Sequence, residues 1–332
     1  MKTLHLTSHS GTRRNIENVF KYLNMSDDIV TESSVYNGLY INKETAHDIW
    51  LYYQSENKLC DYKCLFFTDT SMVARPFLQN IDKHNLFIVI YVTNRFDWGF
   101  FGRKDEDYLK LYSEMSKHER VVFCADNNYD QYYTKVHDIH FLYDKCINLT
   151  PQLCDKIHLP QPENNKFFIY NRGTKIENYQ DILKNHNIEY DVFGPNYSRY
   201  EDSEEICQYK GFIHLPYQVN IQSLWENLGY YIIYFIPSKR FIKELIASES
   251  WYYWEEKDRS QFLEESVDLS EWYIDENKCL FEYFDSWDEL ELKAKNITHD
   301  YLCEKKQVIK DFMIKNNEQN LIKWKDIFSK IN

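Results

Sequence analysis

The sequence lacks any apolar run long enough to cross a bilayer. The longest run, FIVIYV at residues 87–92, is far shorter than the roughly 20 apolar residues that a spanning helix needs. The first residues, MKTLHLTSHSGTRR, pass at once into a predicted strand and lack the apolar stretch of a signal peptide. We therefore expect a soluble protein of the cytoplasm, without a transmembrane segment.

Positive charge is also scarce. The chain has 39 Lys and Arg against 52 Asp and Glu, which gives a formal net charge of −13. Non-specific nucleic-acid binding needs clustered Lys and Arg on the phosphates, so this composition disfavours a nucleic-acid partner. A local basic patch for a small phosphorylated ligand is still compatible with it.

The cysteines show no metal-binding or redox pattern. There is no CxxC pair, and no histidine stands at zinc-finger spacing from them. We interpret all eight as reduced core residues: Cys60, Cys64, Cys124, Cys146, Cys154, Cys207, Cys279 and Cys303.

Short apolar runs alternate with amphipathic segments along both halves of the chain. TLHLTS, CLFFTD, LFIVIYVTN and RVVFCAD alternate with helix-like segments such as NIENVFKYL and DYLKLYSEM. The pattern breaks at LTPQLCDKIHLPQPENNK and restarts at KFFIYNRG. Such alternation indicates βαβ units, so we predict an α/β protein with two Rossmann-like, doubly wound domains.

The interruption at LTPQLCDKIHLPQPENNK indicates where one domain ends and the next begins. We predict a first domain over residues 1–155, a second over 166–300, and C-terminal helices over 301–332. Residues 251–291 stand out, with 14 acidic, 3 basic and eleven aromatic side chains. They form either an aromatic-anchored extension of the second domain or a lid whose aromatics face a sugar.

Ligands of doubly wound sheets bind beyond the carboxyl ends of the strands, so the residues after each apolar run are candidates. The first run is followed by His9, Ser10, Gly11 and Thr12, with a helix expected from about Arg14. The glycine permits close backbone approach and a helix N-terminus favours an anionic group, but the absence of GxGxxG disfavours a dinucleotide site. His9 is either a base or substrate ligand, or a structural hydrogen-bonding residue.

We call the residues that directly follow a predicted strand its exit. Three further strand exits in the first half of the chain are polar. They carry Asp69, then Arg95 and Asp97, then Asn127. Exits on one sheet edge favour the wall of a cleft, although Asp and Asn are also common in turns and helix caps.

The first strand of the second half is followed by two cations, Arg172 and Lys175. Such a pair can neutralise a diphosphate, or it can be a surface pair that answers acidic surroundings. The next exit contains Gly194, in a turn whose exposed backbone could meet a planar base.

The stretch YQVNIQSLWENLG at 217–229 follows the strand GFIHLP and predicts a loop and then a helix that ends at Gly229. Glu226, one turn inside this helix, could accept both hydroxyls of a ribose. The alternative is that Ser223 caps the helix and Glu226 points to solvent. The residues that would meet a nucleotide here are Tyr217, Gln218, Asn220, Ser223 and Glu226.

On these residues the chain resembles the GT-B glycosyltransferases, over nearly its whole length. Retaining members often carry two glutamates separated by seven residues, the second on the ribose; here Gln218 holds the first place and Glu226 the second. Arg172 and Lys175 resemble the pair that holds the diphosphate, and the final helices resemble those that cross back to the first domain. The ending YFDSWDELELKAK looks similar to bacterial and large-DNA-virus members, so the cytoplasm would be the host's if the chain is viral.

The resemblance implies a glycosyltransferase that moves a hexose or deoxyhexose from a nucleoside-diphosphate sugar to a hydroxyl of a glycan or glycoconjugate. His9, Asp69 and Asp97 are then the candidate bases of an inverting reaction. Contacts of the cleft with the acceptor would come from Ser10, Gly11, Thr12, Arg95 and Asn127.

We expect no cofactor and no obligatory metal. The only Asp-x-Asp triplet, Asp105-Glu-Asp107, lies in a charged loop and does not follow a strand. The alternative functions are a catalytically inactive nucleotide-sugar-binding scaffold and a sugar-nucleotide epimerase of the same architecture.

Overall fold

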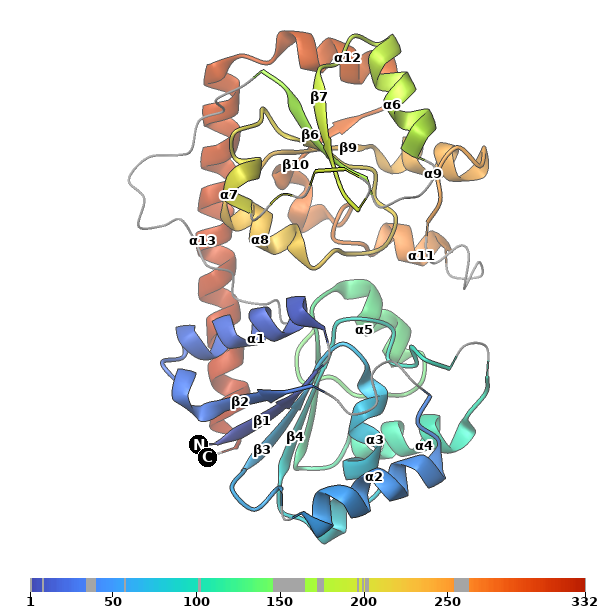
Figure 1. Ribbon diagram of the computed structural model, residues 1–332, viewed down its shortest axis with the longest axis vertical. Coiled ribbons are helices and arrows are strands. Elements are labelled where there is room, and N and C mark those ends of the chain that lie inside the picture. The colour runs from blue at the N-terminus through green and yellow to red at the C-terminus, as the bar shows by residue number, and fades with distance from the viewer. Residues whose placement is uncertain are drawn as a thin grey trace. The chain divides into compact units, whose positions relative to one another are not determined.

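The chain forms two compact units in a computed structural model (Figure 1). Unit 1 comprises Met1–Thr150 and Asn317–Asn332, and unit 2 comprises Pro151–Asn316. The structure describes residues 2–7, 9–33, 40–56, 58–100, 103–145, 165–171, 176–195, 197–198, 200, 203–253 and 263–331.

Unit 1 is built on a parallel sheet in the order β2-β1-β3-β4-β5. All residues of β1, β3, β4 and β5 are buried, as expected for parallel strands covered on both faces, whereas the edge strand β2 is half-exposed. The strands are β1 (Thr3–Leu6), β2 (Ile29–Glu32), β3 (Cys64–Phe67), β4 (Phe87–Val92) and β5 (Val121–Ala125).

The helices of unit 1 cover both faces of this sheet. α1 and the end of α13 lie on one face, and α2, α3 and α4 lie on the other (Figure 1). The helices are α1 (Ser10–Tyr22), α2 (Lys43–Ser55), α3 (Arg75–Leu78), α4 (Glu106–Met115), α5 (Asn128–Lys135) and, from Asn317 on, the long α13 (His299–Ser329), whose first part belongs to unit 2.

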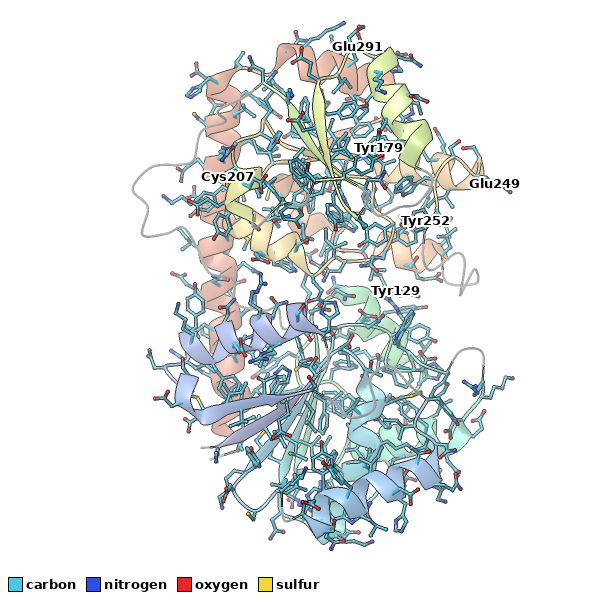
Figure 2. The ribbon with its side chains drawn as sticks, in the orientation of Figure 1. Tyr129, Tyr179, Cys207, Glu249, Tyr252 and Glu291 are labelled. Carbon is cyan, nitrogen blue, oxygen red and sulfur yellow. The ribbon has the colours of Figure 1, made fainter. Side chains whose placement is uncertain are left out.

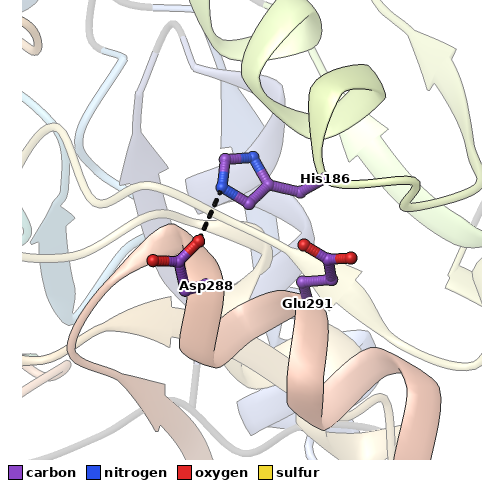
Figure 3. Close-up of side chains that lie close together, drawn as sticks. All are labelled: His186, Asp288 and Glu291. Atoms are coloured by element: carbon purple, nitrogen blue, oxygen red, sulfur yellow. Dashed lines mark ion pairs between the residues drawn. The ribbon is translucent and has the colours of Figure 1, made fainter.

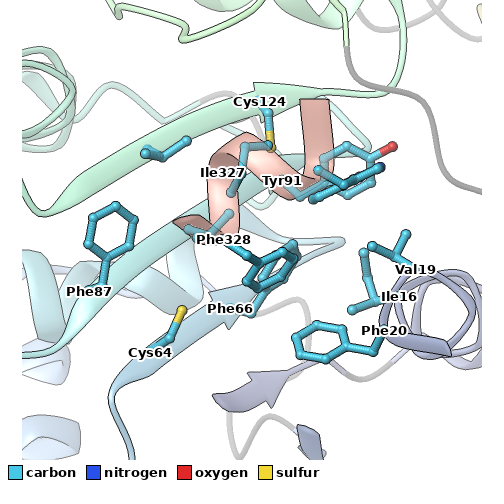
Figure 4. Packing of buried hydrophobic residues seen from close by; sticks show 13 residues of the cluster. Ile16, Val19, Phe20, Cys64, Phe66, Phe87, Tyr91, Cys124, Ile327 and Phe328 are labelled. Atoms are coloured by element: carbon cyan, nitrogen blue, oxygen red, sulfur yellow. The ribbon is translucent and has the colours of Figure 1, made fainter. Parts of the chain in front are cut away.

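The core beneath α1 is closed by the last turns of α13 (Figure 4). Trp324 and Phe328 pack on Phe66 of β3, and the rings of Phe20 and Phe328 lie 4.8 Å apart. Trp324 is fully buried. The end of α13 is therefore an integral part of the core of unit 1.

Unit 2 repeats this architecture, with a parallel sheet in the order β10-β9-β8-β6-β7. The predicted α/β class with two Rossmann-like domains is thus confirmed. The strands are β6 (Phe167–Tyr170), β7 (Tyr190–Phe193), β8 (Phe212–Ile213), β9 (Tyr234–Pro237) and β10 (Phe281–Phe284), and the helices are α6 (Ile176–Asn185), α7 (Ser203–Ile206), α8 (Ser223–Gly229), α9 (Lys239–Ala247), α11 (Leu263–Asp268) and α12 (Trp287–Asn296).

The acidic, aromatic segment is part of unit 2, as far as the structure describes it. It supplies β10, which pairs with β9. Trp272 is fully buried and Trp287 packs on Tyr179 and Phe241. These aromatics anchor the segment in the domain, which favours the extension over a sugar-facing lid.

Several details differ from the sequence-based expectations. α1 begins at Ser10, four residues before Arg14. The thiols of Cys64, Cys124 and Cys207 are buried as predicted, but Cys60 and Cys279 are exposed and Cys303 is half-exposed, so the core interpretation is wrong for these three. Cys146 and Cys154 lie outside the described residues.

Candidate functional site

His9 stands at the carboxyl end of β1 and serves as the N-cap of α1. Its Nδ1 accepts hydrogen bonds from the backbone N–H groups of Gly11 and Thr12, at 3.1 and 3.4 Å. This cap explains why α1 begins at Ser10. Since Nδ1 uses its lone pair here, the neutral ring carries its proton on Nε2 and offers an exposed hydrogen-bond donor, not a base.

A buried polar layer lies beneath this exit. His5 Nε2 lies 2.9 Å from Thr68 Oγ1, and Thr7 and Thr12 share a 2.8 Å hydrogen bond between their hydroxyls. Burial, reinforced by Arg13, lowers the pKa of His5 to about 3, so the ring is neutral. The sequence analysis missed His5, although a polar residue inside an apolar strand is a recognisable sign of such a layer.

Asp69 follows β3 in a left-handed backbone conformation, with φ of 68°. Its backbone N–H donates to Thr93 Oγ1 at 3.0 Å, which joins the β3 and β4 exits. A non-glycine residue rarely adopts this conformation, and such residues gather at functional sites. Asp69 is half-buried at the sheet edge.

Arg95 and Asn127 meet inside the unit. Arg95 pairs with Asp130 at 3.1 Å, and Asn127 donates to Asp126 and Asp130 at 2.6 and 2.7 Å. The exposed fractions are 5% for Arg95, 0% for Asn127 and 1% for Asp130. This buried network, next to the ring of Tyr129 labelled in Figure 2, holds the β4 and β5 exits together; a contact of Arg95 or Asn127 with a ligand stays a prediction.

Asp97 lies near this network at the β4 exit. Its Oδ2 accepts a 3.0 Å hydrogen bond from the hydroxyl of Tyr133, and the residue is half-buried. The bond orients the carboxylate and occupies Oδ2.

Asp105, the first residue of the Asp-x-Asp triplet, has a structural role. It caps α4 through the backbone N–H of Tyr108, at 2.9 Å, and pairs with the buried Arg75 at 2.5 Å. These contacts occupy its carboxylate oxygens.

A pocket of about 290 Å³ lies at the opposite edge of the same sheet. Its lining includes Trp50, Lys63, His84 and Leu86. Lys63 directly precedes β3, and Leu86 directly precedes β4. Because ligands of this fold bind at the other edge, we do not assign this pocket to the candidate site.

In unit 2 the β6 and β7 exits approach each other closely. Gly194 has φ of 144°, and a Cβ at this position would lie 1.9 Å from the backbone oxygen of Asn171. Only glycine fits there. The neighbouring cations Arg172 and Lys175 lie outside the described residues.

The segment after β8 is held by the aromatic extension. Trp272 Nε1 donates to the backbone oxygen of Gln218 at 2.9 Å, and Trp251 Nε1 donates to that of Pro216 at 2.8 Å. The side chain of Gln218 lies 3.4 Å from the hydroxyl of Tyr217. The extension therefore fixes the backbone on which the predicted nucleotide contacts stand.

The remaining residues of this segment lie at or near the start of α8. Asn220 is buried, while Ser223 and Glu226 are half-buried. Gln222 is the N-cap and makes no side-chain cap hydrogen bond, so the alternative that Ser223 caps this helix is wrong. A contact of Glu226 with a ribose stays a prediction.

His214, directly after β8, was missed by the sequence analysis. It is buried, and its ring lies 4.7 Å from that of Trp272. The sequence predicts a strand over GFIHLP, up to Pro216, so His214 falls inside the predicted strand and not after it.

Comparison with known proteins shows which solved structures share this architecture. No protein-family model and no curated protein matches the chain. A crystal structure of a glycosyltransferase from Rickettsia africae is similar, with 10% identity, a TM-score of 0.58, and coverage of 99% of this chain and 98% of that one. Arabidopsis thaliana UGT89C1 in complex with UDP is also similar, with 9% identity, a TM-score of 0.50, and coverage of 100% and 99%.

The fold is of the GT-B type. At this low identity the likeness concerns the fold alone, and it extends to a bacterial and a plant protein, so a particular relation to bacterial or viral members stays a prediction. Among the described residues, none of the helices combines the length and apolar character of a membrane span.

Proposed function

We propose that the chain is a glycosyltransferase, which moves a sugar from a nucleoside-diphosphate sugar to a hydroxyl of a glycan or glycoconjugate without an obligatory metal or other cofactor. The observation that carries the proposal is the pair of five-stranded parallel sheets in a fold shared over the full chain with a glycosyltransferase and with a plant protein that holds UDP. The proposed site of action is cytoplasmic.

Unit 2 would bind the donor at the carboxyl edge of its sheet. The tight contact of Gly194 with Asn171 holds the β6 and β7 exits together, and the bonds from Trp251 and Trp272 fix the 216–218 backbone. Glu226 would accept the ribose hydroxyls. Arg172 and Lys175 would stabilise the departing diphosphate, where most of the charge develops.

Unit 1 would bind the acceptor, and Asp69 is the favoured base. Its carboxylate belongs to a half-buried residue at the sheet edge, in a strained backbone. Asp97 already accepts a hydrogen bond from Tyr133, and His9 already uses Nδ1 as the cap of α1. A retaining reaction would not need this base, so the stereochemistry of the product decides between the two.

The test uses donor-site variants with matched controls. Thermal shift and calorimetry with UDP-, GDP-, CMP- and dTDP-sugars should find one nucleotide class that binds, and Arg172→Ala or Glu226→Ala should weaken that binding by tenfold or more, about 1.4 kcal/mol. Lys184→Ala and Glu276→Ala remove exposed charges elsewhere in unit 2 and should change nothing.

Product analysis then separates the alternatives. Formation of a glycosylated acceptor supports transfer, conversion of the donor alone supports an epimerase, and binding without any product over long incubation supports an inactive scaffold. Unchanged activity with EDTA is expected, and its loss would contradict metal independence.

A further inference from the structure

A histidine and two carboxylates converge on the side of unit 2 where α6 meets α12 (Figure 3). His186 directly follows α6, and Asp288 and Glu291 stand three residues apart on α12, so they share one helix face. One potential ligand atom from each lies within 4.8 Å of the others. In the part of the chain that the structure describes, this is the one such group of three.

The hydrogen bonding of His186 fixes its tautomer. Its Nδ1 lies 2.7 Å from the backbone oxygen of Ile182, which can only accept, so Nδ1 carries a proton. The lone pair of the neutral ring is then on Nε2. Histidines that bind metals are oriented in this way, with the other nitrogen donating to a carbonyl or carboxylate.

The atom that Nε2 faces is also an acceptor. Asp288 Oδ1 lies 3.3 Å away. Two acceptors at this distance repel each other unless a cation lies on or between them. That cation is either a second proton on the ring or a metal ion.

The spacing fits a metal ion. Bonds of 2.0–2.2 Å in a tetrahedral arrangement put neighbouring ligand atoms about 3.4 Å apart. The 3.3 Å between His186 Nε2 and Asp288 Oδ1 matches this value, and the atom from Glu291 lies within 4.8 Å of both. The side chains of His186 and Glu291 are 23% and 21% exposed, and that of Asp288 is 92% exposed and free to adjust. Lys295 now pairs with Glu291 and would have to yield its place.

We propose that His186, Asp288 and Glu291 bind a divalent transition ion such as Zn²⁺, with water completing the coordination. An imidazole with carboxylates suits Zn²⁺ and its neighbours in the first transition row, whereas Mg²⁺ and Ca²⁺ prefer oxygen ligands alone.

The position of the site gives the ion a structural role. His186 precedes β7, so it lies near the amino edge of the parallel sheet, away from the carboxyl edge of the proposed donor site. The ion would join the α6–β7 loop to α12, segments a hundred residues apart in the sequence. Since only the folded chain presents this site, binding stabilises the folded state by mass action. The proposal is independent of the glycosyltransferase function.

Calorimetric titration of ZnCl₂ into the metal-stripped full-length protein tests it. Wild type should bind one ion more than His186→Ala, or bind it at least about tenfold more tightly, as ligand loss demands. The same loss of binding is expected for Asp288→Asn. Because the Asp288 side chain is 92% exposed, this change should not unfold the protein, so a loss of binding would be due to the lost ligand. MgCl₂ should give no such difference.

Two further variants sharpen the result. His47→Ala removes an exposed histidine of α2 and should leave binding unchanged. Lys295→Met removes the cation that now pairs with Glu291 and should tighten binding. Equal stoichiometry and affinity in wild type, His186→Ala and Asp288→Asn would overturn the proposal and leave a proton as the cation, with any Zn²⁺ bound at exposed groups such as Cys60 and Cys279.

Discussion

At the scale of single residues, burial decides which polar groups of unit 1 act as structure. His5, Arg95, Asn127 and Asp130 are all at most 5% exposed. Burying such groups is costly unless each finds a partner, and the hydrogen bonds to Thr68 and among Arg95, Asp130 and Asn127 supply those partners.

The buried state of His5 predicts a pH dependence. Its folded-state pKa of about 3 lies below the ordinary 6.5, so between these values the unfolded chain binds a proton that the folded chain does not. The free energy of unfolding should therefore fall as the pH falls through this window, by up to about 1.4 kcal/mol per pH unit from this residue. Denaturation of His5→Gln against pH should show a shallower slope, while His47→Gln keeps the wild-type slope.

The Arg95–Asp130 pair should show strong coupling. Arg95→Met or Asp130→Leu alone leaves a buried charge and should cost about 3–5 kcal/mol. The double variant should cost at least about 1 kcal/mol less than the sum of the single variants. The exposed pair Arg13–Glu17 is the control, with coupling of at most about 1 kcal/mol. Additive effects at Arg95 and Asp130 would contradict the network.

Gly194 should not tolerate a side chain. Gly194→Ala places Cβ against the backbone of Asn171 in a left-handed conformation, so we expect a loss of about 2 kcal/mol or more in urea denaturation. Gly11→Ala, in the helical first turn of α1, should be neutral or stabilising by up to about 1 kcal/mol. Equal effects would show that the β6 and β7 exits do not meet as described.

At the scale of elements, the long helix α13 supplies part of the core of unit 1. Trp324→Ala opens a cavity against Phe66 and Tyr91, and should lower the free energy of unfolding by about 3–5 kcal/mol. Ile322 is 69% exposed on the same helix, so Ile322→Ala should change stability by no more than about 0.5 kcal/mol. Chemical denaturation of both proteins measures the difference, and similar values would contradict the packing.

Most of the strands that the sequence predicts are continuously buried; the edge strand β7, half-exposed at three of its four residues, is an exception. β3, β4, β5 and β9 consist of aliphatic and aromatic residues, cysteine and proline. The edge strands β2 and β10 were not predicted, because each has an exposed or half-exposed side with polar residues such as Thr31 and Glu282. Their pairing is decided by the neighbouring strand, which no local pattern contains.

The candidate site is predictable only in part for the same reason. Polar residues after a strand place His9, Asp69 and Asp97 at one sheet edge. The partners that set their chemistry come from elsewhere in the chain: Thr93 for Asp69 and Tyr133 for Asp97. These pairings depend on strand order and helix packing, which spacing alone does not give.

At the scale of the whole molecule, net charge sets a condition on the proposed donor. A chain with a formal charge of −13 repels a nucleoside diphosphate at long range, so local groups must supply the attraction. Under the proposed function, Arg172 and Lys175, which follow β6 in the sequence, would supply it.

The most direct test of the central claim is calorimetric titration of the full-length protein with UDP-, GDP-, CMP- and dTDP-sugars, each with EDTA present. Saturable binding of one nucleotide class with one site per chain is the predicted result. Absence of binding to every donor in the panel would contradict the assignment of this GT-B fold to sugar transfer.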